Sequence, residues 1–224
     1  MAYFRDRTDA GRHLAHELRR YAGRFDVLVL ALPRGGVPVA FEVAKALGAP
    51  LDVFIVRKLG LPQYQELAIG AIASGGVRVL NEALIRTAGV SQADIETVTA
   101  AEERELNRRL RRYRGDRPFP EIAGRTVILI DDGLATGSTM QAAVTALRQE
   151  RPAAIVVAVP TAPPETCDAF RGLVDEVVCA VTPEPFYGVG LWYLDFSQTT
   201  DEEVHELLER ARDRFDGSAA GRIP

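Results

Sequence analysis

Short apolar runs alternate with amphipathic segments along most of the chain. Five runs rich in Val, Leu and Ile have the length and composition of strands buried on both faces, at residues 26–32, 51–56, 127–130, 154–159 and 176–180. A shorter run, at 77–80, follows a stretch rich in glycine. Strands that alternate with helices favour a mostly parallel sheet with helices on both faces. The pattern therefore predicts a three-layer α/β/α fold.

Amphipathic periodicity predicts the helices that connect and follow these strands, at 9–21, 37–47, 82–87, 91–113, 140–149, 164–173 and 201–215. Gly48 is a natural end for the second helix, and Asn81 and Asp201 are candidate N-caps. Residues 59–76 contain four glycines and a proline, so we expect a turn-rich connection there. The small, polar tail from Gly217 onward is predicted to be mobile.

The length and composition fit one α/β domain with small additions. The chain has 224 residues, of which 47% are hydrophobic and 26% charged, as in ordinary soluble globular proteins. We predict a single domain over 1–224, with a core at about 9–181 and a closing helix at about 201–216. Residues 182–198 are loop-like and rich in aromatic side chains, and we expect them to form a small covering segment, the hood, joined by residues 1–8.

Charge and cysteine content narrow the possible partners and the compartment. The net charge of −4 gives no electrostatic case for nucleic acid as a partner. No apolar run approaches the ~20 residues of a membrane span, and the N-terminus lacks the apolar core of a secretory signal. Cys167 and Cys179 have neither metal-ligand spacing nor a disulfide-rich context, so we expect two buried or half-buried free thiols in a reducing cytoplasm.

The strongest chemical signal is the fourteen-residue stretch 126–139, TVILIDDGLATGST. The acidic pair, Asp131 and Asp132, stands where the buried strand ends, and a turn with two glycines and three hydroxyls leads into a helix. Free amides at a helix start favour an anion, and carboxylates suit ribose hydroxyls or Mg²⁺. The stretch predicts a sugar-phosphate site formed by Asp131, Asp132, Gly133, Leu134, Ala135, Thr136, Gly137, Ser138 and Thr139.

Two further motifs follow strands. Pro33-Arg34-Gly35-Gly36 follows the run at 26–32, and Arg57-Lys58 follows the run at 51–56. Ligands of such sheets bind at the carboxyl ends of the strands, where the winding reverses. Cationic turns opposite an acidic, phosphate-binding turn suit a substrate with one phosphate at one end and a diphosphate at the other.

Residues 126–139 resemble the phosphoribosyl diphosphate signature of the type I phosphoribosyltransferases, especially its adenine-type form with Ala-Thr-Gly in the turn. The resemblance extends over about 26–196. A bacterial branch shares Arg-Lys-Leu-Gly, Glu-Leu-Ala-x-Gly-Ala-Ile and Trp-Tyr-x-Asp-Phe-Ser-Gln, which stand here at 57–60, 66–72 and 192–198. The resemblance to the type I phosphoribosyltransferases implies a sheet of order 3-2-1-4-5-6 with strand 3, at 77–80, antiparallel.

The resemblance also implies residue roles. The phosphate turn, 135–139, holds a 5′-phosphate, and the acidic pair holds the ribose hydroxyls and, mostly through substrate and water, Mg²⁺. The diphosphate loop, Pro33 to Gly36, often contains a cis peptide, here between Pro33 and Arg34. Arg57 and Lys58 add charge for the leaving diphosphate, and the segment after them matches a mobile loop that closes over the site. The implied catalytic residues are Arg34, Arg57, Lys58, Glu66, Asp131 and Asp132.

The acceptor is not identified by these motifs. The branch that acts on 6-oxopurines has a further aspartate in the phosphate turn, where this chain has Ala135. The hood would cover a nucleobase-like acceptor with Phe186, Tyr187, Trp192 and Asp195, and Glu66 or Asp195 is a candidate general base. Members of the family commonly form homodimers and serve nucleotide metabolism.

Three functions fit these features to different degrees. A Mg²⁺-dependent phosphoribosyltransferase explains all three motifs. A non-catalytic sensor of phosphoribosyl diphosphate or nucleotides has the same fold, but does not require the cationic groups Arg34, Arg57 and Lys58. A receiver domain that binds Mg²⁺ at the acidic pair leaves the phosphate turn and the diphosphate loop unexplained.

Overall fold

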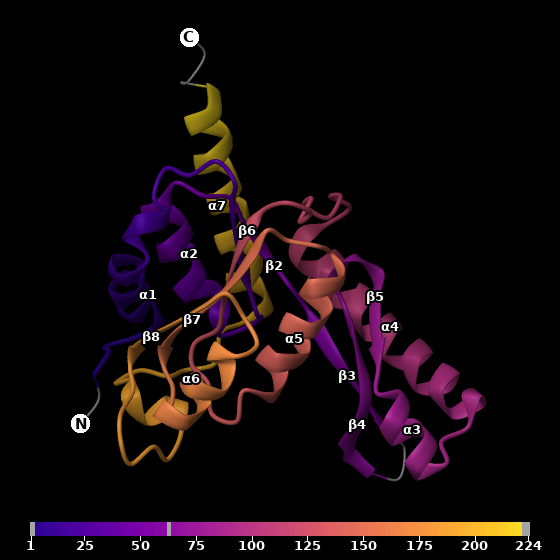
Figure 1. The fold of residues 1–224 in the computed structure, drawn as a ribbon. Helices are drawn as coiled ribbons and strands as arrows, with labels where there is room; N and C mark the ends of the chain where they lie inside the picture. Colours follow the sequence, from indigo (N-terminus) through magenta and orange to yellow (C-terminus); the bar gives the residue numbers. More distant parts are fainter. Residues whose placement is uncertain (1–2, 62–63, 221–224) are drawn as a thin grey trace.

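A computed structural model describes residues 3–61 and 64–220, apart from the side chains of 61, 64–67 and 216–220. Its main sheet has five parallel strands in the order β2-β1-β6-β7-β8 (Figure 1). They are β1 (Val27–Ala31), β2 (Leu51–Val53), β6 (Thr126–Ile130), β7 (Ala154–Thr161) and β8 (Glu176–Val181). Every residue of β1 and β6 is buried, which explains why all of them except Thr126 are apolar. The predicted α/β class is confirmed.

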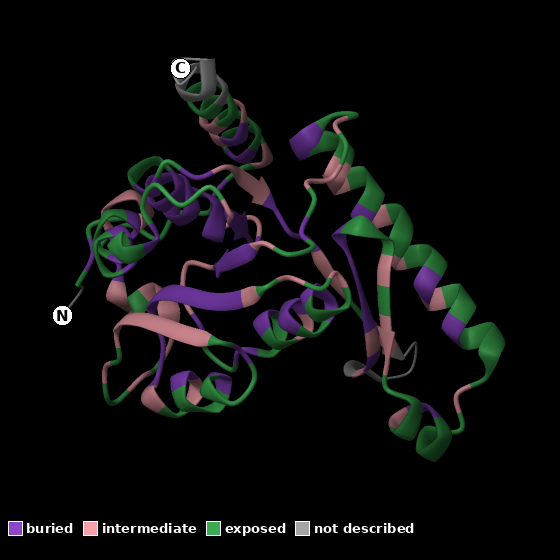
Figure 2. Ribbon diagram, turned by 45° about the horizontal axis from the view of Figure 1, so that its top comes forward, coloured by how far each residue is buried: buried purple, intermediate pink, exposed green. Residues whose placement is uncertain are grey.

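Helices cover both faces of this sheet, and side chains alternate between the two layers. Val27 and Val29 of β1 belong to the cluster formed with α1 (Arg7–Glu17), α2 (Gly36–Leu47) and α7 (Asp201–Ala220). Leu28 and Leu30 pack on the opposite face, against α5 (Ser138–Gln149) and α6 (Pro164–Arg171). Figure 2 shows the buried strands between the helices. None of the helices in the described ranges has the length and apolar character needed to cross a bilayer.

A second, antiparallel sheet forms a lobe beside α5 (Figure 1). It contains β3 (Val56–Leu61), β4 (Tyr64–Ala73) and β5 (Val77–Leu80), followed by α3 (Glu82–Ala88) and α4 (Gln92–Arg114). The prediction of a turn-rich connection over 59–76 is wrong, because most of the described part of that segment is the β3–β4 hairpin. Residues 62–63 lie outside the described residues, and the mobility expected of the segment stays a prediction. The predicted strand 51–56 is divided between β2 and β3. The strand at 77–80 is antiparallel, as expected, but it pairs with β4 rather than with the main sheet.

Two glycines of the β3–β4 hairpin explain why the sequence predicts turns in this segment. The β3–β4 register shifts next to Gly60, so this residue marks a bulge within a strand rather than its end. A Cβ atom on Gly70 would lie 2.3 Å from the carbonyl oxygen of Val79, so glycine allows β5 to approach β4 closely. In the sequence alone, both glycines indicate turns. At the other end of the chain, α7 continues to Ala220, past the predicted start of the mobile tail, of which 221–224 lie outside the described residues.

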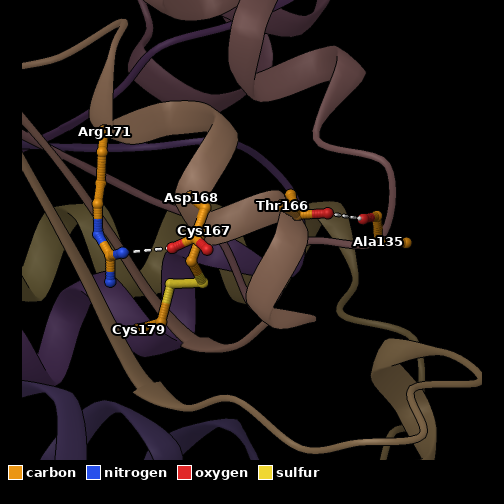
Figure 3. The surroundings of a disulfide bond; sticks show 6 residues. All are labelled: Ala135, Thr166, Cys167, Asp168, Arg171 and Cys179. Atoms are coloured by element: carbon orange, nitrogen blue, oxygen red, sulfur yellow. Dashed lines mark hydrogen bonds and ion pairs between the residues drawn. A yellow bond between two sulfur atoms is a disulfide. The ribbon is translucent and has the colours of Figure 1, made fainter.

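Cys167 and Cys179 form a disulfide bond, so the prediction of two free thiols is wrong (Figure 3). Cys167 is buried on α6 and Cys179 lies on β8, the strand that follows that helix. The chain from β7 through α6 to β8 makes one crossover, and packing of the helix on the sheet brings the two sulfurs together. Only 12 positions separate the cysteines, a spacing that by itself indicates no bond.

We predict that replacing both cysteines by alanine lowers the free energy of unfolding by about 2–3 kcal/mol, because the bond closes a short loop in the unfolded chain. Urea denaturation followed by circular dichroism measures this loss. A dithiol reductant should lower the urea midpoint of the wild-type protein and leave that of the double variant unchanged. Equal midpoints for the oxidised wild type and the double variant would contradict the prediction.

Candidate functional site

The carboxyl ends of β1 and β6 bring the diphosphate loop against the acidic pair. The amide of Leu32 donates to the carbonyl of Ile130 at 2.8 Å, and the Pro33–Arg34 peptide is cis, as the resemblance implies. A Cβ atom on Gly35 would lie 2.0 Å from Oδ2 of Asp132. Only glycine permits this approach. Two motifs separated by about a hundred residues therefore share one site.

Burial disfavours the charged form of both carboxyl groups of the acidic pair. The amide of Asp132 donates to Oδ1 of Asp131 at 2.8 Å. Burial raises the pKa of Asp131 well above its usual range, and the charge of Asp132 raises it further. Burial also raises the pKa of Asp132, although the Arg7 guanidinium opposes this shift. The pair therefore favours a ligand that brings positive charge or hydroxyl donors.

Arg7 is part of the site although sequence reasoning did not select it. Its Nε donates to Oδ2 of Asp132 at 2.8 Å, and its Nη1 donates to the carbonyl of Ser197 at 2.6 Å. Its guanidinium lies 4.0 Å from the centre of the Phe196 ring. The sequence carried no local signal for this residue, because it lies in the first turn of an ordinary amphipathic helix. Its partners come from distant parts of the chain.

The phosphate turn is open to solvent and supported from beneath. Gly137 precedes α5 with a φ of 71°, and a Cβ atom there would lie 2.6 Å from the Phe170 ring. Thr166 donates from Oγ1 to the carbonyl of Ala135 at 2.9 Å. The N-cap residue of α5, Gly137, makes no side-chain cap hydrogen bond, the Thr136 hydroxyl accepts only a long 3.5 Å contact from the Ser138 amide, and Ser138 and Thr139 are exposed. The turn therefore offers helix-terminal amides and hydroxyls to an anion.

Arg57 and Lys58 diverge, because consecutive residues of a strand point to opposite faces. Nζ of Lys58 donates to Oγ of Ser138 in the phosphate turn at 2.7 Å. Nε of Arg57 instead donates to Glu102 of α4 at 2.6 Å. The two were expected to act together on a diphosphate. In the structure only Lys58 contacts the predicted site, and the contact is at the phosphate turn.

The Arg34 guanidinium is directed away from the acidic pair. Nη1 of Arg34 lies 3.7 Å from Oδ1 of Asp201, at the start of α7. Glu66 lies in β4, and its side chain is outside the described residues. The structure thus brings Gly35, Gly36 and the acidic pair together directly, while the Arg34 guanidinium lies toward α7.

The hood is assembled from both ends of the chain. Phe4 pairs with Tyr193 in a parallel bridge, and both side chains are buried. The Tyr193 hydroxyl donates to the carbonyl of Asp132 at 2.5 Å, so the hood is attached to the acidic pair. Phe186 and Trp192 stack on each other with centroids 6.3 Å apart. The remaining predicted hood residues, Tyr187 and Asp195, are exposed.

A cavity of about 640 Å³ lies beside the phosphate turn, between the antiparallel lobe and α5. Lys58 and Ser138 line it, together with Asn81, Gln141 and Thr145. Its size is that of a small-molecule site. Within the described part of the chain, Lys58 reaches α5 through a single hydrogen bond, the one to Ser138. Space therefore remains around the turn for a bound phosphate and its water.

The donor set fits magnesium held mainly by a substrate. Across residues 3–61 and 64–220, no group of three or more His, Cys, Asp or Glu side chains is arranged to hold a metal. Mg²⁺ is usually bound through one or two carboxylates, with water and substrate phosphates completing its shell. Asp131 and Asp132 supply two carboxylates next to the predicted phosphate positions. They fit this mode of binding and no all-protein cage.

Known proteins share this fold. The model of the phosphoribosyl transferase domain matches residues 4–189. The crystal structure of TT1426 from Thermus thermophilus is 44% identical, with a TM-score of 0.83, and the match covers 94% of this chain and 99% of that one.

Two curated relatives extend the comparison. The candidate phosphoribosyl transferase Rv0571c of Mycobacterium tuberculosis is 48% identical over 215 residues, 96% of this chain and 48% of that protein. The bifunctional protein PyrR of a Roseiflexus species is 32% identical over 148 residues, 65% of this chain and 62% of that protein. The chain thus spans about half the length of the mycobacterial relative. A family model that matches most of the chain, together with a shared fold at 44% identity, identifies it as a member of the phosphoribosyl transferase domain family.

Proposed function

We propose that this chain is a Mg²⁺-dependent phosphoribosyltransferase that transfers the 5-phosphoribosyl group of phosphoribosyl diphosphate to a nucleobase-like acceptor and releases diphosphate. One observation carries the proposal. The acidic pair, the glycines of the diphosphate loop and the open start of α5 meet at one edge of the sheet. This edge offers ligands for a ribose between a phosphate and a diphosphate. Family membership makes that donor the natural occupant.

The donor is held at three points. The 5′-phosphate accepts hydrogen bonds from the amides and hydroxyls of residues 135–139 and from Lys58, whose ammonium already contacts Ser138. Asp131 and Asp132 accept hydrogen bonds from the ribose hydroxyls. The diphosphate lies against Gly35 and Gly36, and Arg34 turns toward it from its contact near Asp201. Arg57 is left out of this assignment because it is paired with Glu102.

The reaction is a displacement at the anomeric carbon. The bond from this carbon to the diphosphate oxygen breaks and leaves its electron pair on the diphosphate. The lone pair of a ring nitrogen of the acceptor forms the new bond, and the base loses a proton from another nitrogen. The transition state resembles an oxocarbenium ion, as in glycoside cleavage. Bound Mg²⁺ supplies charge neutralisation for the leaving diphosphate. Protein groups orient the sugar, and the backbone amides of the loop stabilise the departing oxygens.

The acceptor enters from the side of the hood. Phe186 and Trp192 form an aromatic pair there, and Tyr193 connects that segment to the acidic pair. The Ser197 amide holds the pKa of Asp195 below its usual range, which makes this exposed carboxylate a weak base. We therefore favour an acceptor whose attacking ring nitrogen carries an available lone pair, so that the proton is lost to water from another nitrogen of the base.

The direct test is release of diphosphate from phosphoribosyl diphosphate and Mg²⁺ in the presence of a panel of nucleobases. We predict that Asp131→Asn/Asp132→Asn lowers the rate by about 10²-fold or more, because two charge-assisted hydrogen bonds to the sugar are lost. Release with one base that is lost in this variant supports transfer. Tight binding of the donor without release under any acceptor would instead favour the sensor.

A second prediction separates the two cations of β3. Lys58→Ala should weaken binding of phosphoribosyl diphosphate by about tenfold or more, because a charged hydrogen bond to a phosphate is worth about 1.5–3 kcal/mol. Arg57→Ala, the matched control on the opposite face of the strand, should leave donor affinity within about threefold, since its ion pair with Glu102 is half-buried and outside the site. Titration calorimetry measures both. Equal losses would contradict the assignment of Lys58 alone to the donor.

A third prediction concerns stability. Burial raises the pKa of Asp131, so the folded chain retains a proton that the unfolded chain releases, and stability falls as the pH rises through that window. Asp131→Asn removes this cost and still offers an amide oxygen to the Asp132 N–H. At neutral pH, with EDTA present, it should raise the melting temperature by about 2–4 °C, or about 1 kcal/mol. Calorimetry at several pH values should show the gain shrinking toward acid pH, and a lower melting temperature would refute the prediction.

A further inference from the structure

The guanidinium of Arg7 lies where three parts of the candidate site meet. It contacts Asp132 of the acidic pair and the Phe196–Ser197 segment of the hood. A Cβ atom on Gly35 would lie 3.2 Å from its Nε, so the diphosphate loop is also adjacent. The side chain is only 12% exposed. An arginine enclosed in this way is not an ordinary surface residue of α1.

The geometry of the ion pair decides whether Arg7 blocks the site or supports it. A guanidinium that sealed Asp132 would bind both carboxylate oxygens side by side. Arg7 instead donates to Oδ2 through Nε alone, and Nη1 is directed to the Ser197 carbonyl. Oδ1 therefore stays outside the ion pair and can accept a ribose hydroxyl while Arg7 remains bound to Oδ2. We call this set of contacts, in which Arg7 binds both Asp132 and the Phe196–Ser197 segment, the brace.

We propose that Arg7 is a positioning residue that couples occupancy of the acidic pair to the hood over the acceptor. The inference rests on the proposed transfer at that pair. When the donor binds Asp132, the carboxylate gains new partners and its contact with Arg7 adjusts. Since the guanidinium is also fixed to Phe196 and Ser197, the hood adjusts with it. The acceptor then meets a hood arranged by the donor.

The hood contains a buried hydrogen-bond donor that would gain a partner if the hood rearranged. The indole N–H of Trp192 is buried, and no hydrogen-bond partner for it occurs among the described residues. A buried donor without a partner costs free energy, so a rearrangement that supplies one is favoured. Trp192 is close to the brace through Tyr193, whose ring centre lies 5.0 Å from that of Phe196. It is also the only tryptophan of the chain, so its fluorescence reports on the hood.

Removal of Arg7 should leave the fold intact. The hood is separately attached by the bridge between Phe4 and Tyr193 and by the hydrogen bond from the Tyr193 hydroxyl to the Asp132 carbonyl. Arg5 provides a matched control from the same segment. Its side chain is 70% exposed and pairs with Asp9 of α1, and it is only the backbone carbonyl of Arg5, which the substitution leaves in place, that contacts the hood at the Asp195 amide. Arg5→Ala therefore removes a guanidinium and an ion pair without touching the brace.

The experiment compares the wild type with Arg7→Ala, Arg7→Lys and Arg5→Ala. Acrylamide quenching of Trp192 is measured in the free protein and with phosphoribosyl diphosphate and Mg²⁺, and donor affinity is measured independently by calorimetry. In the free protein, Arg7→Ala should make Trp192 more accessible to the quencher, and Arg5→Ala should not. The donor should alter quenching in the wild type and in Arg5→Ala. In Arg7→Ala it should bind within about fivefold of wild type and leave quenching unchanged.

Turnover provides a second readout. Arg7→Ala should raise the KM for the acceptor by about tenfold or more with little change in donor KM, because the hood is no longer held in place. Arg7→Lys, which keeps the charge but not the planar fork, should restore part of the donor response. If Arg7→Ala fails to fold, Phe196→Ala removes the other side of the same contact and should give the same losses.

Several results would overturn the inference. Unchanged quenching of Trp192 in free Arg7→Ala would exclude the brace, whether or not the donor binds. Donor affinity that rises about tenfold in this variant would show that Arg7 blocks the site. Failure of the wild type to bind the donor would refute the proposed function, and the free-protein comparison would still decide whether Arg7 holds the hood.

Discussion

Two adjacent carboxylates at the end of a fully buried strand are the constraint around which this molecule is arranged. β6 is buried along its whole length, and Asp131 and Asp132 follow it directly. Their raised pKa values show that the free chain bears an electrostatic cost here. The surroundings offset part of it through the cation of Arg7 and an amide hydrogen bond within the pair. Perturbed carboxylates of this kind concentrate at functional sites, because ligands complete the compensation.

The opposite end of the site depends on support from below. The phosphate turn must stay open to bind an anion, so its rigidity cannot come from its exposed side. Thr166 and Phe170 of α6 hold Ala135 and Gly137 from beneath. Between these two residues in sequence, Cys167 connects the helix to β8 through the disulfide. The outer crossover of the sheet, far from the acidic pair in sequence, thus fixes the shape of the turn.

The sequence was most informative where burial is two-sided. β1 is apolar at every position and β6 at every position except Thr126, whatever their partners, so the sequence predicts both runs to within a residue or two. Features that depend on distant contacts could not be found in this way. The role of Arg7 requires Phe196 and Asp132 to be brought to it, and the disulfide requires the crossover of α6. Gly70 is a residue type typical of turns, but its role here is to let β5 pass close to β4, which the local sequence does not reveal.

The antiparallel lobe presents a cation to the phosphate turn from a strand, where the sequence predicts a turn-rich connection. A cation that must be ordered as its ligand binds loses conformational entropy, which weakens affinity. Here β3 and β4 form a hairpin, held to α4 by Arg57 and Glu102 on one face. Its other face presents Lys58 to the phosphate turn before any ligand arrives. The alternation of a strand thus turns two neighbouring cations into an anchor and a preorganised ligand group.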